Sequence, residues 1–196
     1  MKKYEEERYL FENIKEKIYP WVTNSLSGVD ALNGKQISEK DTPIISFVGD
    51  LVILLVIKRG EDAYEIIKDN MLPPDCDVET VYHLACENLA RDVEFVIGNT
   101  MYGAFAILAD GIHEVSSLCF RHIWSVCVDK IGDDLLIMAP NRDLVLFAPA
   151  SMEDAVAKMR RHAEQGYAAK PHRISTELYL FTKDGKELLA YEETGH

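Results

Sequence analysis

The polar residues best suited to chemistry lie in a short break between two apolar runs. Arg142 and Asp143 separate Leu135–Ala139 from Leu144–Ala148. A guanidinium at this position can bind a carboxylate or phosphate through two parallel hydrogen bonds, because its donors form a planar fork. The same break suits a plain turn, in which Asn141 and Asp143 bond to the local backbone. Both interpretations stay open from the sequence.

Asn88 is a third candidate for ligand binding, on a different predicted element from Arg142 and Asp143. If the three side chains face one cleft, they indicate an enzyme of unknown reaction. If they do not, the chain is better described as a non-catalytic module that binds a protein or a small ligand. The sequence favours the binding module and leaves catalysis uncertain.

Two pairs of metal-binding residue types share a helical spacing. His83 and Cys86 are three residues apart, and so are Cys119 and His122. Residues three apart lie on one face of a helix, so two adjacent helices could offer zinc a tetrahedral set of ligands. The alternative is that Cys86 and Cys119 pack as small apolar side chains. No metal and no other cofactor is expected, and the zinc set remains the alternative.

Familiar catalytic motifs do not occur in the chain. It has no Gly-x-Gly-x-x-Gly loop, no phosphate loop ending in Gly-Lys-Ser/Thr, no Gly-x-Ser-x-Gly elbow, no His-Glu-x-x-His and no Cys-x-x-Cys. Cys127 and His122 are five residues apart on one predicted helix, which is poor geometry for a nucleophile and its base. Active sites can still be assembled from distant residues, so missing motifs do not exclude catalysis.

The elements that must position these residues alternate between strand pairs and helices. Four hairpins are predicted: Leu51–Ile57 with Ala63–Ile67, Val93–Ile97 with Tyr102–Leu108, Leu135–Ala139 with Leu144–Ala148, and Glu177–Phe181 with Glu187–Tyr191. Three helices separate them: Val78–Ala90, Ile112–Lys130 and Met152–Gln165. Short strand pairs favour antiparallel pairing. The predicted class is α+β, a mainly antiparallel sheet in the order ββαββαββαββ with covering helices.

Helix boundaries are predicted from capping residues. Asp77 and Ser151 precede two of the helices and can cap them. Gly132 and Gly166 follow two helices and can end them in a left-handed conformation. The third hairpin is apolar on both faces, so it belongs in the middle of a covered sheet.

The N-terminal segment is predicted to be an accessory element. Residues 4–19 have the periodicity of a helix, which Pro20 ends, and Thr23–Thr42 is expected to be a long loop. Residues 1–43 therefore form a helix and loop, and residues 44–196 form a single domain.

Charge and composition limit the possible partners. The chain has 196 residues and a net charge of -12, which disfavours nucleic acid and anionic membranes. Ten acidic residues lie between Glu61 and Glu94, on a solvated surface or a docking face for a basic partner.

No signal peptide is expected, and no apolar run reaches the ~20 residues that span a bilayer. The four cysteines show no disulfide spacing. A cytoplasmic protein with a protein partner, or a homodimer, is expected.

A group of short motifs runs in order from about Asp50 to Tyr191. They are Asn88-Leu89, Tyr102-Gly103-Ala104, Asp110-Gly111, the stretch Ala139–Leu144, and Tyr179-Leu180-Phe181. In these motifs the chain resembles the YtpQ-like family and its relatives, uncharacterised bacterial proteins of unknown function. The resemblance implies the hairpin-and-helix fold and supports a strand at Ala63–Ile67. The family has no established activity, so it implies no catalytic residues.

Overall fold

The computed structural model describes residues 10–24, 37–61 and 63–192, and the chain divides into two compact units. The first unit extends to Ser46 and resumes at Val52–Asp92, and the second contains Phe47–Leu51 and the chain from Val93 onward. The sequence predicted a boundary near residue 43. In the structure, the described residues before it pack with Val52–Asp92 instead.

A four-stranded sheet forms most of the first unit. Its strands are β1 (Ile18–Asn24), β2 (Ile45–Val48), β3 (Leu51–Lys58) and β4 (Tyr64–Ile66). The order is β1-β3-β2, and β4 also pairs with β3, antiparallel to it. The predicted hairpin of β3 and β4 is therefore confirmed. β3 lies inside the sheet, which explains why nearly every one of its residues is apolar and buried.

The predicted N-terminal helix is confirmed in part: its first residues lie outside the described ranges, residues 11–17 are helical, and Ile18 and Tyr19 belong to a strand. Only α2 (Phe11–Ile14) and the 3-10 turn η1 (Lys15–Lys17) are helical, and β1 follows at once. From Ile18 to Thr23 the chain is rich in aromatic and β-branched residues, which favour a strand, and all of these residues are buried. This preference outweighs the helical periodicity. Pro20 does not stop a helix here. It is tolerated because β1 is an outer strand in the sheet order.

Helix α3 (Val78–Asp92) packs its apolar stripe against this sheet. Val81 and Ala85 join Ile14, Ile18 and Leu55 in one buried cluster. Asp77 precedes the helix, and its Oδ1 accepts a hydrogen bond from the Glu79 amide at 3.4 Å, as the capping prediction requires. The helix therefore begins where the sequence predicted it and ends two residues later.

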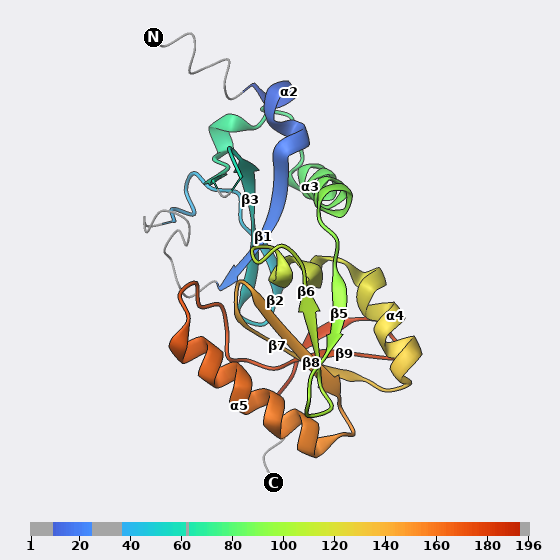
Figure 1. The fold of residues 1–196 in the computed structure, drawn as a ribbon. Coiled ribbons are helices and arrows are strands. Elements are labelled where there is room, and N and C mark those ends of the chain that lie inside the picture. Colours follow the sequence, from blue (N-terminus) through green and yellow to red (C-terminus); the bar gives the residue numbers. More distant parts are fainter. Residues whose placement is uncertain (1–9, 25–36, 62, 193–196) are drawn as a thin grey trace. The chain divides into compact units, whose positions relative to one another are not determined.

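The second unit contains a six-stranded antiparallel sheet. Its strands are β5 (Val96–Asn99), β6 (Phe105–Leu108), β7 (Leu135–Asn141), β8 (Leu144–Pro149), β9 (Tyr179–Phe181) and β10 (Leu188–Ala190). Their order is β10-β9-β7-β8-β6-β5, and Figure 1 shows β7 and β8 in its middle. The α+β fold built from successive hairpins is confirmed, with the strands distributed over two sheets.

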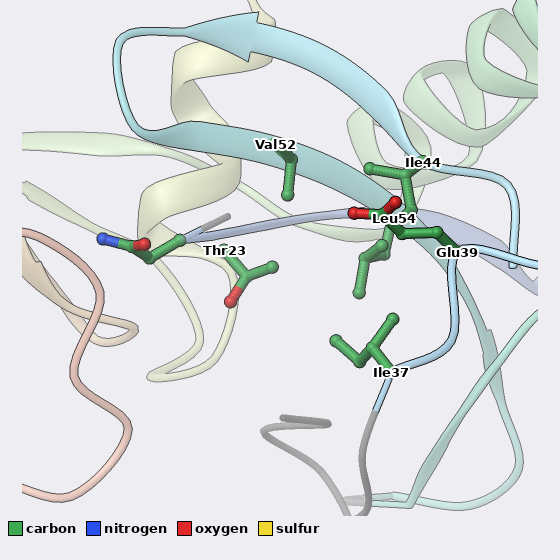
Figure 2. A pocket seen from close by; sticks show the side chains of 7 residues that line it. Thr23, Ile37, Glu39, Ile44, Val52 and Leu54 are labelled. Carbon is green, nitrogen blue, oxygen red and sulfur yellow. The ribbon is translucent and has the colours of Figure 1, made fainter. Parts of the chain in front are cut away.

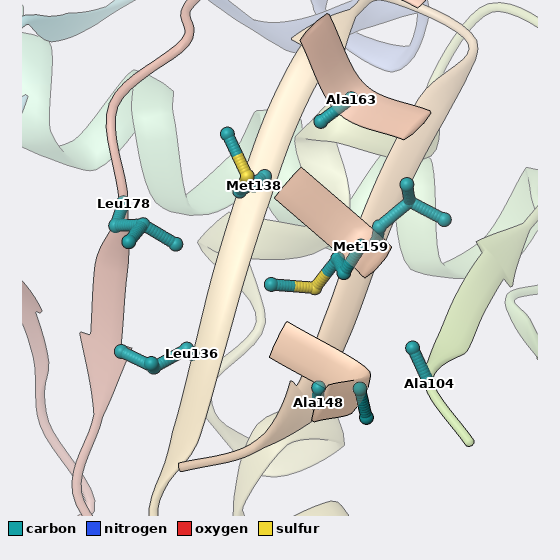
Figure 3. Packing of buried hydrophobic residues seen from close by; sticks show 9 residues of the cluster. Ala104, Leu136, Met138, Ala148, Met159, Ala163 and Leu178 are labelled. Atoms are coloured by element: carbon teal, nitrogen blue, oxygen red, sulfur yellow. The ribbon is translucent and has the colours of Figure 1, made fainter. Parts of the chain in front are cut away.

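The central hairpin is covered on both faces, as its sequence predicted. Helix α5 (Glu153–Ala169) lies across β7 and β8 on one side (Figure 1). Figure 3 shows Met159 reaching from this helix over the strands toward Leu136 and Leu178. Alternate residues face the other way, where Phe147 meets the edge of Trp124 with ring centroids 5.2 Å apart.

The helix predicted at Ile112–Lys130 is divided into two parts. A 3-10 segment, η3 (Glu114–Cys119), precedes α4 (Arg121–Ile131), and Phe120 between them has ψ 84°. Trp124 Nε1 donates a hydrogen bond of 2.9 Å to the carbonyl of Ser117, so the indole bridges the break. Gly132 ends α4 with φ 81°, as predicted.

Two predictions for α5 are wrong. Ser151 does not cap the helix, because its hydroxyl bonds to Asp133 at 2.6 Å instead. Gly166 does not end the helix, which continues to Ala169. A Cβ at residue 166 would lie 3.0 Å from Leu144 Cδ2, so glycine here permits the helix to approach the β7–β8 turn closely.

Candidate functional site

The turn that carries Arg142 and Asp143 is tied to neighbouring segments of the second unit. Asp143 forms an ion pair with Lys170, at 2.8 Å, and its side chain is 39% exposed. Arg142 is 5% exposed, and burial lowers the pKa of its guanidinium to about 9, because the charged form loses its water. The two side chains thus do not extend together into solvent. Neither residue lines the two cavities described below.

The backbone of this turn is also anchored. β7 has an extra residue opposite β8, since Met138 pairs with Leu146 and Asn141 with Leu144. Such a bulge explains how Pro140 fits a central strand. Beyond it, the Arg142 amide donates to the carbonyl of His172 at 3.1 Å. The turn is therefore fixed by backbone bonds on the side away from β8.

Asn88 lies in the first unit, where it bonds to the backbone. Its Nδ2 donates to the carbonyls of Lys15 at 2.8 Å and of Ile18 at 3.0 Å. The side chain is 3% exposed. Asn88 therefore joins α3 to the segment that leads into β1. No described contact links it to Arg142 or Asp143.

An open groove in the first unit has a volume of about 420 Å³. Its wall is formed by η1, the start of β1, the end of β3 and the last turn of α3. The lining residues, four of them basic and two acidic, are Glu16, Lys17, Tyr19, Lys58, Arg59, Gly60, Arg91 and Asp92. A volume in this range is typical of small-molecule sites. An excess of basic side chains is unusual in a chain of net charge -12.

One acidic residue of the groove is neutralised within it. The Nε and Nη2 of Arg91 each lie 2.7 Å from a different oxygen of Asp92. Tyr19 donates its hydroxyl to Asp92 Oδ2 at 2.6 Å. The hydrogen bond from Arg91, ahead of that from Tyr19, lowers the pKa of Asp92 to about 2 despite its partial burial. Burial and the same carboxylate raise the pKa of Tyr19, so its proton stays on the phenol.

Two lysines of the groove remain available to a ligand. Lys17 is exposed and Lys58 is partly exposed, and neither is in a described ion pair, although the nearby charge of Lys58 contributes to the lowered pKa of Asp92. Arg59 differs, because its Nε lies 2.7 Å from Glu65. The groove can therefore attract an anion, chiefly through two ammonium groups.

Sequence reasoning missed the groove. It placed residues 4–19 in a helix and named none of the groove residues as candidates. Their positions are dispersed over the first half of the chain and share no motif. Only the packing of α3 against η1 and β1 brings them onto one wall.

A second cavity of the first unit has a volume of about 80 Å³. Figure 2 shows Leu54 and Ile37 facing each other across it, with Thr23 to one side. This space would hold about two or three waters and is smaller than a typical ligand site. We therefore assign it no function.

A buried polar cluster lies between β6 and η3 in the second unit. His113 is 1% exposed, and its Nδ1 lies 2.7 Å from Asp110 Oδ2. Burial alone would raise the pKa of Asp110, but hydrogen bonds from His113 and Ile112 lower it to about 2. Glu114 Oε1 accepts the amides of Ala109 and Gly111, at 3.1 and 2.8 Å. These contacts shape the loop that enters η3.

The turn between β2 and β3, which belongs to the second unit, is held within that unit by a carboxylate. Asp50 accepts hydrogen bonds from the hydroxyls of Tyr179 and of Ser175, the latter at 2.8 Å. Gly49 has φ +54°, and a Cβ there would lie 3.3 Å from the Tyr179 ring. The glycine therefore allows both the turn and the close approach. This arrangement is structural, because the side-chain oxygens have partners inside the protein.

The residues proposed for zinc do not form a metal centre. His83 and Cys86 lie in the first unit, and Cys119 and His122 in the second, where Phe120 interrupts their expected helical face. Among the residues that the structure describes, no three His, Cys, Asp or Glu side chains gather as metal ligands.

The cysteines carry no catalytic signal. All four are free, and burial raises the pKa of the Cys127 thiol to about 11, well away from a reactive thiolate. A Cys127–His122 nucleophile therefore gains no support.

No helix in the described part of the chain combines the length and the apolar character needed to cross a bilayer. No protein-family model, no curated protein and no solved structure matches the chain. The resemblance to the YtpQ-like family therefore stays a prediction.

Proposed function

We propose that this chain is a non-catalytic binding module that holds a small anionic ligand in the groove of its first unit. The observation that supports it is the cavity of about 420 Å³ in which neither Lys17 nor Lys58 is in a described ion pair, since Lys58 acts on Asp92 only as a nearby charge. Asp92 is neutralised by Arg91, so it opposes an anion less than its formal charge suggests. The remaining field is favourable to negative charge.

The proposal extends to the setting of the module. A net charge of -12 supports a small ligand or a protein as partner rather than nucleic acid or an anionic membrane. A cytoplasmic location belongs to the same proposal. The enzyme hypothesis at Arg142 and Asp143 needed both side chains in one cleft, whereas Asp143 pairs with Lys170. We therefore keep the binding module as the leading function.

The test is calorimetric titration of the full chain with a panel of small anions, namely pyrophosphate, citrate and glycerol 3-phosphate. Low salt is required, because ions screen exposed charges beyond about 10 Å at 0.1 M. At least one anion should bind, and the double substitution Lys17→Gln and Lys58→Gln should weaken that binding by about tenfold or more.

The matched control removes the same charge elsewhere. Lys40 and Lys130 are exposed, lie outside the groove, and can both be changed to Gln. Binding should persist in this control. Absence of binding to every anion, or an equal loss in both double variants, would overturn the proposal.

A further inference from the structure

Both arginines of the groove are already engaged in other contacts, Arg91 through all three of its nitrogens and Arg59 through one. Arg91 uses Nε and Nη2 on Asp92, Nη2 also on the Glu16 carbonyl, and Nη1 on Asn88 Oδ1 at 3.3 Å. Arg59 uses Nε on Glu65. A carboxylate ligand is recognised best by a free guanidinium fork, which presents two parallel donors. Neither arginine presents that fork with all its donors free.

The available donors are instead the two ammonium groups. A lysine ammonium acts as a compact charge with three rotatable donors and binds phosphate in that manner. Lys17 comes from η1 and Lys58 from the end of β3, so they approach the groove from different elements. A tetrahedral group with several equivalent oxygens can accept from both.

Charge density also discriminates between anions. Glu16 lines the groove and is exposed, and the last turn of α3, with its negative dipole end, lies there too. These oppose any anion, so binding requires that attraction to the two lysines outweigh them, and that attraction grows with the charge of the ligand. A phosphomonoester carries a charge of about -1.5 to -2 at neutral pH, which matches two lysines.

The fold also argues against a nucleoside triphosphate. The helix end at this groove is the C-terminus of α3, whereas phosphate chains are usually held by the amides of a helix N-terminus. The Gly60 amide, which could serve instead, already bonds to the carbonyl of Ala63 at 3.3 Å. The groove of about 420 Å³ leaves room for a small organic body beside one phosphoryl group.

From these contacts we infer that the ligand of the groove is a small phosphomonoester, whose phosphoryl group is held between Lys17 and Lys58. This inference rests on the proposed anion-binding function and names its ligand class. The organic body lies along the remaining wall, beside Tyr19 and Gly60.

The test compares two dianions of different shape on the full chain. Glycerol 3-phosphate should bind about tenfold or more tightly than succinate at about pH 8, and this preference should vanish in the Lys17→Gln and Lys58→Gln variant. The Lys17→Arg and Lys58→Arg variant should retain binding, since it keeps both charges. Thermal melting of each variant verifies that it is folded.

A pH titration supplies a second readout. The second pKa of a phosphomonoester is about 6, so the affinity for glycerol 3-phosphate should fall between about pH 8 and pH 5. Sulfate keeps its charge over this range, and the described residues that line the groove include no histidine, so sulfate affinity should stay level.

The outcomes separate the two proposals. Succinate binding equal to or tighter than glycerol 3-phosphate, still dependent on the two lysines, would overturn the phosphomonoester and leave the anion site intact. Binding that ignores both lysines, or no binding of any anion, would overturn both.

Discussion

Asn88 shows at the scale of one residue how a polar side chain can matter through the backbone. Its amide satisfies two carbonyls at the point where η1 gives way to β1, and it does so while buried. Buried carbonyls without donors are costly, so the bonds fix the position of the segment that carries Lys17. Asn88 is accordingly a residue that positions the groove wall rather than one that lines the groove.

We predict that Asn88→Ala lowers the free energy of unfolding by about 1–3 kcal/mol, because a buried and a partly buried carbonyl lose their donor. Urea denaturation monitored by circular dichroism measures this. Asn70, which is exposed in the 3-10 turn η2 (Asp69–Met71), gives the matched Asn→Ala control and should change stability little. Equal effects of the two substitutions would contradict the structural role of Asn88.

Asp110 gives a prediction about acid stability. Its pKa in the folded protein is about 2, below the ordinary value of 3.8. A depressed carboxyl pKa stabilises the fold above the unfolded-state value, and that contribution is lost as the pH falls toward the folded-state value. The stability due to Asp110 should therefore be complete above about pH 4 and decline between about pH 4 and pH 2.

The measurement is the free energy of unfolding against pH for the natural chain and for Asp110→Asn. The variant should be less stable at neutral pH and should show a shallower decline in that acid range. Asp184→Asn changes an exposed carboxylate in the β9–β10 turn and should reproduce the natural curve. An Asp110→Asn curve parallel to the natural one would show that the His113 contact does not set this pKa.

At the scale of elements, the packing of α5 on the central hairpin depends on a glycine inside a helix. A glycine in a helix interior lowers helix stability by about 1 kcal/mol relative to alanine. On helix propensity alone, Gly166→Ala should therefore stabilise α5. The new Cβ would lie 3.0 Å from Leu144 Cδ2 and 3.2 Å from Asn141 Oδ1. Asn141 is fully buried and has little room to move. We expect the crowding to dominate, with a loss of about 1 kcal/mol or more.

A double-mutant cycle isolates the crowding. Leu144→Ala removes the nearer contact atom, so Gly166→Ala should be much less harmful, or favourable, in that background. Thermal unfolding of the four proteins measures the coupling. Additive effects would mean that the contact with Leu144 does not determine why residue 166 is glycine.

At the scale of the whole molecule, the described part of the N-terminal segment, residues 10–24 and 37–43, belongs to the first unit. Deletion of residues 1–43 removes β1, whose residues from Ile18 to Thr23 are buried. We expect this truncation to abolish the hydrogen-exchange protection of the β3 amides, because β1 is a neighbour of β3 in the sheet. The β7 and β8 amides in the same sample serve as an internal reference. Persistent protection of β3 would contradict this assignment.

Much of the fold could be predicted because the signals were local. Each hairpin has an apolar run, a polar break and a second apolar run, and all four predicted pairs are paired in the structure. The prediction fails where local sequence signals compete with tertiary packing. Ile18 fits a helical stripe and a buried strand equally well, and Phe120 interrupts a periodic helix because Trp124 bonds back to Ser117.

The candidate site could not be predicted, because it depends on distant residues. Lys17, Lys58 and Arg91 have ordinary surroundings in the sequence, and nothing in their spacing distinguishes them from solvated charges. The sequence around Arg142 and Asp143 suggested a ligand site more strongly. In the structure, however, Arg142 is buried and Asp143 forms an ion pair with Lys170. Which charges are already neutralised is a property of three-dimensional contacts.

The α+β class, the hairpins and the central place of β7 and β8 follow from local sequence patterns, since periodicity and turn chemistry act over a few neighbouring residues. Three features are visible only in the folded chain: residues 18–24 form a strand, Asn88 bonds to the backbone, and Lys17 and Lys58 share a groove. Burial and charge pairing depend on which distant segments meet. Local sequence patterns carry no information about contacts between distant segments.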